Sequence, residues 1–214
     1  MKKSLPLFIL LTAAAMLFVL SAAVAVPILL RPFYYAHVFL LDLPDKTGWT
    51  AGEICGAYDE MLDFCLFGAP FGTGVLRWSQ EGMRHFADCA VLFRLDLAVL
   101  LFSSLVLLLG RALKKRGILP AQPLGRGSGF WAGCLLAGAF AAVGALAALN
   151  FERAFVLFHR LFFPGKMNWL FDPAADQIIL VLPQVFFRNC AILVLLLLLG
   201  GCALLILRDL RRRR

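Results

Sequence analysis

Residues 186–207 read FFRNCAILVLLLLLGGCALLIL, and this stretch decides the fold class of the chain. A helix needs about 20 apolar residues to cross a hydrocarbon core about 30 Å thick. The stretch is long enough, and its one charged residue, Arg188, lies near its start. The sequence therefore predicts a membrane-spanning helix here.

Three further segments have the same character, namely residues 5–30, 89–110 and 130–149. The composition agrees, because 62% of the residues are hydrophobic and only 16% are charged. Soluble domains have about 25% charged residues. We therefore expect an all-α integral membrane protein with four transmembrane helices.

Basic residues indicate how these helices are oriented. Twelve of the 21 Lys and Arg residues precede the first span, lie between the second and third spans, or end the chain. Short cytoplasmic loops carry an excess of Lys and Arg, so both termini are expected in the cytoplasm. The net charge of +8 is thus a topology signal, with membrane lipids as the expected neighbours and no nucleic-acid partner.

This orientation places residues 31–88 and 151–185 on the extracytoplasmic face. Glycine and proline interrupt the first of these segments, and helices are expected over 58–67 and from Ser79 onward. The second segment alternates aromatic, polar and turn-forming residues, a pattern typical of a loop folded against lipid headgroups. We expect the two segments to form a small cap on a single membrane domain, residues 1–214.

All three histidines, His37, His85 and His159, fall in these outer segments. Imidazole is the side chain best suited to proton transfer near neutral pH. Glu81 and Asp88 share one face of the predicted helix with His85, so either carboxylate is placed to orient that ring. The sequence predicts a catalytic site at the outer membrane surface, and His85 with Glu81 and Asp88 is the group that spacing favours within it.

Other kinds of site have weaker support. Ser79 is the one serine in an outer segment, and no Gly-x-Ser-x-Gly motif surrounds it. The six cysteines contain no CxxC pair, and a disulfide between Cys55 and Cys65 stays open. Two alternatives remain: a metal-dependent membrane hydrolase with three histidine ligands, and a non-enzymatic membrane assembly factor. We expect neither a metal nor a cofactor.

Two motifs resemble the bacterial lipoprotein intramolecular transacylase (Lit) family. The first is residues 81–88, Glu-Gly-Met-Arg-His-Phe-Ala-Asp, and the second runs from residues 158–159, Phe-His, through 168–173, Asn-Trp-Leu-Phe-Asp-Pro. The four spans and the length of 214 residues are also similar to this family. Where the family pattern has leucine and valine, this chain has Phe86 and Cys89, which preserve apolar character.

The resemblance implies an acyltransferase at the outer face of the cytoplasmic membrane. Its substrates would be lipoproteins whose N-terminal cysteine carries a diacylglyceryl thioether. The enzyme would move the fatty acyl chain from the sn-2 glyceryl oxygen to the cysteine α-amine of the same molecule. The product would be a lyso-form lipoprotein, and no second lipid donor would be consumed.

The resemblance implies that His85, His159, Glu81 and Asp88 are the catalytic residues, and this reaction suits them. An α-amine with a pKa near 7.7 to 8 must lose a proton before it attacks an ester. His85 is a candidate general base, and His159 is a candidate for protonating the glyceryl oxygen or binding the oxyanion. The sequence leaves the division of roles between the two histidines open. Candidate substrate-binding residues are Arg94, Arg160, Lys166, Asn168, Trp169 and Asp172.

Overall fold

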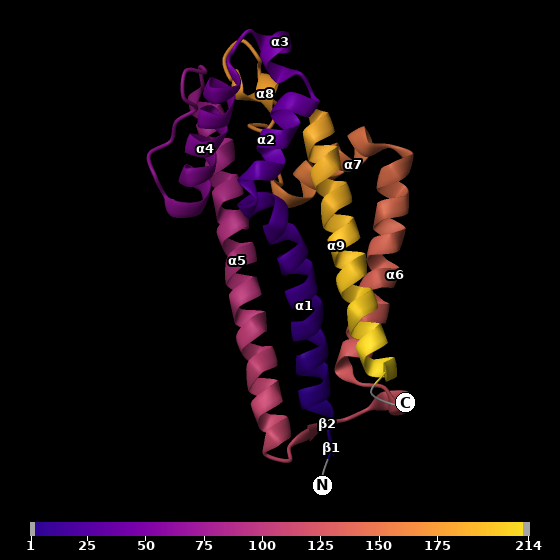
Figure 1. The fold of residues 1–214 in the computed structure, drawn as a ribbon. Helices are drawn as coiled ribbons and strands as arrows, with labels where there is room; N and C mark the ends of the chain where they lie inside the picture. Colours follow the sequence, from indigo (N-terminus) through magenta and orange to yellow (C-terminus); the bar gives the residue numbers. More distant parts are fainter. Residues whose placement is uncertain (1–2, 212–214) are drawn as a thin grey trace. The chain divides into compact units, whose positions relative to one another are not determined.

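The computed structural model describes residues 3–211 and is built mainly of helices (Figure 1). Within that range, four helices are long and apolar enough to cross a membrane. They are α1 (Leu5–Leu29), α5 (Gln80–Lys115), α6 (Ser128–Leu149) and α9 (Gln184–Arg211). Each covers one of the four predicted segments, so the all-α, four-span fold class is confirmed.

Helix α5 is longer than a membrane span requires. Its 36 residues rise about 1.5 Å each, or about 54 Å in total, whereas the hydrocarbon core is about 30 Å thick. The helix begins one residue after Ser79, as predicted, and Ser79 Oγ accepts a hydrogen bond from Gly82 N at 3.0 Å. The first turns of α5, which carry His85, therefore precede its spanning part.

The chain forms two compact units. Unit 1 contains the residues up to Ala25, Asp96–Leu149 and the residues from Leu193 onward. Unit 2 contains Val26–Leu95 and Asn150–Ile192. Unit 1 contains most of the length of the spanning helices, and both predicted outer segments fall in unit 2.

The core of unit 1 is formed by α1, α6 and α9. Val19, Leu136 and Leu198 come from these three helices and pack into one buried cluster. Gly133 on α6 lies so close to the backbone carbonyl of Cys202 on α9 that a Cβ atom would meet it at 2.8 Å. A small residue therefore allows these two helices to approach closely, as is common between membrane helices.

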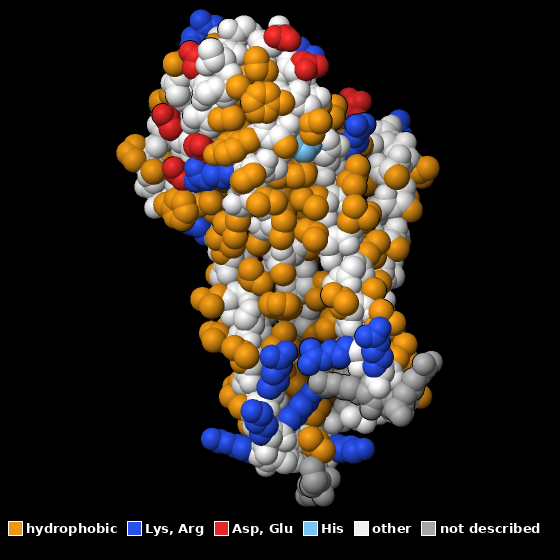
Figure 2. Space-filling view, in the orientation of Figure 1, with side chains coloured by type: hydrophobic (Ala, Val, Ile, Leu, Met, Phe, Trp, Pro, Cys, Tyr) orange, Lys and Arg blue, Asp and Glu red, His pale blue; other side chains and the backbone are white. Residues whose placement is uncertain are grey.

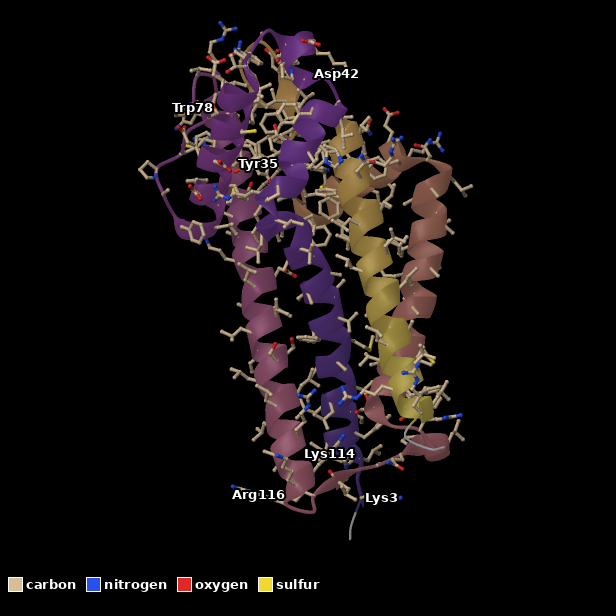
Figure 3. All side chains as sticks on the ribbon, viewed as in Figure 1. Lys3, Tyr35, Asp42, Trp78, Lys114 and Arg116 are labelled. Carbon is tan, nitrogen blue, oxygen red and sulfur yellow. The ribbon has the colours of Figure 1, made fainter. Side chains whose placement is uncertain are left out.

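One end of unit 1 is basic. Strand β1 (Lys3–Ser4) pairs in parallel with β2 (Leu119–Pro120), a short pairing that the sequence analysis did not predict. Lys3, Lys114 and Arg116 lie at this end (Figure 3). In the space-filling view the Lys and Arg side chains gather there, and hydrophobic side chains cover the surface along the helices (Figure 2). This distribution suits helices that are flanked by basic residues on one side of a membrane.

Unit 2 combines the N-terminal parts of α5 and α9 with shorter helices. These are α2 (Arg31–Leu40), α3 (Leu43–Thr47), α4 (Ala51–Phe67), α7 (Phe151–Phe162) and α8 (Ile178–Val181).

Contacts between distant parts of the sequence hold unit 2 together. Tyr34 on α2 stacks on Tyr58 of α4 with ring centroids 3.9 Å apart. The Tyr34 hydroxyl donates a hydrogen bond to the carbonyl of Val181 on α8 at 2.9 Å. Arg31 forms an ion pair with Asp59 at 2.9 Å. The two outer segments of the sequence are therefore joined within one unit.

One expectation for the outer segments needs correction, and one question that the sequence left open is answered. Residues 151–162 form an amphipathic helix, α7, where the sequence indicated a loop; Asn150 caps this helix by accepting a hydrogen bond from Arg153 N at 2.9 Å. Cys55 and Cys65 are both free thiols, so no disulfide joins them. Helix α4 also begins at Ala51, earlier than predicted, because Thr50 and Glu53 form a capping box.

Candidate active site

Two of the three histidines come together in unit 2. His85 is on α5 and His159 is on α7, and their ring centroids are 5.9 Å apart with 31° between the ring planes. Both side chains are buried, with exposed fractions of 5% and 8%. This histidine pair is the centre of the candidate site.

A hydrogen bond to the backbone fixes the tautomer of His159. Its Nδ1 lies 2.8 Å from the carbonyl oxygen of Phe155, one helical turn earlier. A carbonyl can only accept a hydrogen bond, so Nδ1 carries the proton and Nε2 keeps its lone pair. Burial lowers the pKa of His159, although the bond to Phe155 partly opposes this effect. Trp169 stacks on the ring with centroids 4.7 Å apart.

Aromatic rings enclose His85. Phe163 and Phe171 lie with their ring centroids 4.9 and 5.4 Å from the imidazole. Nε2 is 3.5 Å from the thiol sulfur of Cys89, one turn further along α5. The other nitrogen, Nδ1, is buried and has no hydrogen-bond partner among the described residues. One polar atom of His85 is therefore left for a ligand.

The expectation that a carboxylate orients His85 is wrong. Glu81 forms an ion pair with Arg84. Asp88 accepts hydrogen bonds from Lys166 Nζ at 2.5 Å and from Asn168 Nδ2 at 3.1 Å. A charged ammonium is a stronger partner for a carboxylate than a buried neutral imidazole. Asp88 therefore holds the loop that follows α7 and does not hold the His85 ring.

Asp176 is an important residue that the site prediction omitted. Its carboxylate accepts hydrogen bonds from the backbone N and the hydroxyl of Ser79, both at 2.7 Å. A Cβ atom on Gly82 would collide with this carboxylate. Asp176 is 5% exposed, and it lies at the positive end of the α5 helix dipole. Only its position among turn-forming residues hinted at this role.

Three of the predicted substrate-binding residues have other surroundings. Arg94 donates to the carbonyl oxygens of Phe64 and Cys65, both at 2.9 Å, and so caps the end of α4. Asp172 accepts a hydrogen bond from Ala174 N at 3.0 Å within a turn. Arg160 is exposed on α7. Of the six predicted binding residues, Trp169 contacts the histidine pair directly, and Lys166 and Asn168 reach Asp88.

The third histidine lies in a different environment. His37 Nδ1 donates to the Phe33 carbonyl at 2.7 Å, and Nε2 accepts from Asn189 Nδ2 at 3.0 Å. Both nitrogens are therefore occupied. Within residues 3–211, no three His, Cys, Asp or Glu side chains are grouped so that they could hold a metal ion. The hydrolase alternative needs three histidine ligands around one metal ion, and His37 does not lie with the other two.

A pocket of about 390 Å³ lies between the first turn of α5 and the loop after α7. The residues that line it are Glu81, Lys166, Met167, Asn168, Leu170 and Asp176. Neither histidine lines this pocket, but Asn168, which does, donates a hydrogen bond to Asp88 one turn after His85 on α5.

Four spanning helices and a buried, aromatic-lined histidine pair define a multi-pass membrane protein with a site suited to acid–base catalysis. The family model for the lipoprotein intramolecular transacylase Lit matches residues 9–187, and the chain belongs to this family. It is therefore an acyltransferase that acts on lipoproteins. Among curated proteins, no sequence matches the chain.

Solved structures support the assignment over nearly the whole chain. The membrane-integral lipoprotein intramolecular transacylase Lit from Bacillus cereus is 27% identical, with a TM-score of 0.83. The match covers 97% of this chain and 93% of that protein. Structures of the same protein with an H85R or an H85A mutation match with TM-scores of 0.74 and 0.76, at 25% and 26% identity, over 97% of this chain. These two matches cover 93% and 94% of the H85R and H85A chains.

Proposed function

We propose that the enzyme moves the sn-2 acyl chain of a diacylglyceryl-modified lipoprotein to the α-amine of its N-terminal cysteine, with His159 as general base and His85 as oxyanion donor. The observation that carries this assignment is the difference between the two rings. His159 has its Nδ1 proton bound to a backbone carbonyl, whereas the Nδ1 atom of His85 is buried without a partner.

The assignment for His85 depends on its tautomer. Cys89 is a neutral thiol, and its S–H group can donate to His85 Nε2 across the 3.5 Å between them. The ring proton then sits on Nδ1, where it can donate to a negatively charged oxygen. An unpartnered donor inside a site from which aromatic rings exclude water is the arrangement that stabilises an oxyanion.

The reaction follows from these two positions. The neutral α-amine of the substrate attacks the sn-2 carbonyl carbon, and His159 Nε2 takes the amine proton. The oxyanion that forms accepts a hydrogen bond from His85 Nδ1. When the bond to the glyceryl oxygen breaks, His159 returns the proton to that oxygen. The products are an amide and a free hydroxyl, and both histidines end neutral.

The substrate supplies both the nucleophile and the ester, so no covalent nucleophile is required. The ring of Trp169 on His159 and the Phe rings around His85 keep water from the reacting atoms. Asp88 contributes by holding Lys166 and Asn168 over the site. Glu81 would face the substrate from the first turn of α5. We assign Arg94 and Asp172 to holding the site in shape, and Arg160 to an exposed position near it.

The proposal also includes a membrane arrangement. Residues 31–88 and 151–185 form an extracytoplasmic cap on a single membrane domain, residues 1–214, of the cytoplasmic membrane. Both termini are cytoplasmic. The basic end of unit 1 (Figure 3) supports this orientation. Membrane lipids surround the spans, and the acyl chains of the substrate remain in the hydrocarbon layer.

The test uses purified protein in detergent and a synthetic lipopeptide with a diacylglyceryl cysteine and a free α-amine. Fragmentation mass spectrometry distinguishes the substrate from a product of equal mass whose amine is acylated and whose sn-2 oxygen is vacant. We expect conversion by the wild type, and a rate about 10²- to 10⁴-fold lower for His159→Gln.

The matched control is Arg153→Gln, an exposed residue on the same helix. It should convert the lipopeptide at the wild-type rate. A folded wild-type protein that leaves the amine free would contradict the reaction. Equal rates for His159→Gln and Arg153→Gln would contradict the role of His159.

A further inference from the structure

The pocket at the first turn of α5 is lined by side chains to which the proposed acyl transfer gives no chemical step. It lies at the first turn of α5 and is lined by charged, polar and apolar side chains. We propose that it binds the polypeptide of the substrate, namely the residues that directly follow the acylated cysteine. This inference rests on the proposed function and adds a peptide-binding subsite to it.

The position of the pocket favours a peptide. The acyl chains of the substrate belong in the hydrocarbon layer, whereas peptide N–H and C=O groups would be left there without hydrogen-bond partners, which is strongly unfavourable. The peptide must therefore leave the site on the side away from the spanning part of α5. The first turn of that helix, which carries Glu81, forms one wall of the pocket on that side.

Asn168 supplies a hydrogen-bond acceptor for a peptide. Its Nδ2 donates to the Asp88 carboxylate, which only accepts, so the orientation of the amide is fixed. The remaining atom, Oδ1, is buried and has no partner among the described residues. A backbone N–H group of the substrate is the complementary donor.

The other walls also suit a peptide. Met167 and Leu170 have exposed fractions of 66% and 56%, and they offer apolar surface to a side chain of the substrate. Glu81 and Asp176 add carboxylates, and Lys166 adds an ammonium group. A lining with both charges fits a neutral, polar backbone better than it fits a lipid phosphate, which the carboxylates would repel.

The experiment compares two substrates with the full-length enzyme in detergent. One is a diacylglyceryl-cysteine amide, and the other carries four further residues after the cysteine. The wild type should have a KM about fivefold lower for the longer substrate, with little change in kcat, because the added contacts form in the ground state and the transition state alike. Leu170→Ser should remove most of this difference.

The matched control is Leu40→Ser, which changes a leucine on α2 with an exposed fraction of 72%. It should keep the difference in KM. An equal KM for both substrates in the wild type would overturn the peptide subsite and leave the acyl transfer intact. Failure to convert either substrate, with folded protein, would instead contradict the proposed function. The proposal would also be overturned if an anionic phospholipid inhibited the conversion of both substrates equally and the length of the peptide had no effect on KM.

Discussion

His159 owes its properties to the backbone and to burial. The Phe155 carbonyl fixes its proton on Nδ1, and burial lowers its pKa. Its Nε2 therefore stays unprotonated at neutral pH, as a general base requires. His85 is buried as well, but no backbone carbonyl fixes its ring: Nδ1 has no partner among the described residues, and Nε2 lies beside the Cys89 thiol.

The lowered pKa of His159 makes the stability of the protein depend on pH. Below the ordinary value of 6.5, the unfolded chain binds a proton at this residue more readily than the folded chain does. The free energy of unfolding should therefore fall as the pH decreases below 6.5. We expect the Tm of the wild type to decrease more steeply from pH 7.5 to 5 than that of His159→Gln. Parallel Tm curves would contradict this account.

Cys89 is the residue most easily mistaken for a nucleophile. In our account it only shares a weak hydrogen bond with His85. Cys89→Val should therefore lower kcat by no more than about fivefold, the value of one modest hydrogen bond. Measured rates of acyl transfer give kcat for the variant, and an unchanged KM shows that substrate binding is intact. A loss of activity comparable to that of His159→Gln would show that the thiol forms a covalent intermediate.

The start of α5 determines where His85 lies. Ser79 caps the helix, and Asp176 holds Ser79 through two hydrogen bonds of 2.7 Å. Gly82 makes room for the Asp176 carboxylate. Gln177 adds a reciprocal pair of hydrogen bonds with Arg77, at 2.8 and 3.0 Å. These contacts align the helix of His85 with the loop that carries Trp169.

Removal of this cap should be measurable as a loss of stability. Ser79→Ala should lower the free energy of unfolding by about 1 kcal/mol, the usual value for a helix N-cap. Asp176→Asn should lower it as well, because the charge at the helix N-terminus is lost. Thermal unfolding in detergent measures both effects. Arg188→Gln, which changes an exposed residue of α9 beyond its first turn, is the control and should leave Tm unchanged.

The sequence predicts the spanning elements well and the site only in part. A span is decided by the local composition of about 20 residues, so residues 186–207 alone predict α9. The partners of Asp88 and Ser79 are Lys166 and Asp176, which are far away in the sequence. Helical spacing placed Asp88 near His85, but the tertiary contact with Lys166 was stronger. Such contacts between segments cannot be obtained from local spacing.

The two units of the molecule differ in the charges that they carry. The outer segment 31–88 is acidic, with four basic and eight acidic residues. Unit 1 carries basic residues at the ends of α5 and α9, among them Lys115 and Arg208. In Figure 2, Lys and Arg side chains gather at the base of unit 1, and Asp and Glu side chains are visible on unit 2.

Site-directed labelling tests this topology. Lys46→Cys lies in α3 of unit 2, and Lys115→Cys lies at the end of α5 in unit 1. A membrane-impermeant thiol reagent added to intact cells should label the first variant and leave the second unlabelled until the membrane is opened. The background should have its six native cysteines replaced by alanine or serine. Labelling of Lys115→Cys in intact cells would reverse the proposed orientation.

The central claim is that one substrate molecule supplies both the acyl chain and the amine that receives it. The most direct measurement mixes two lipopeptides, one with a heavy sn-2 acyl chain and a light peptide, the other with a light acyl chain and a heavy peptide. Mass spectrometry of the products of the wild-type enzyme then shows which amine received which chain. The account predicts that every acyl chain stays with its original peptide. Products in which heavy acyl chains are joined to heavy peptides would contradict it.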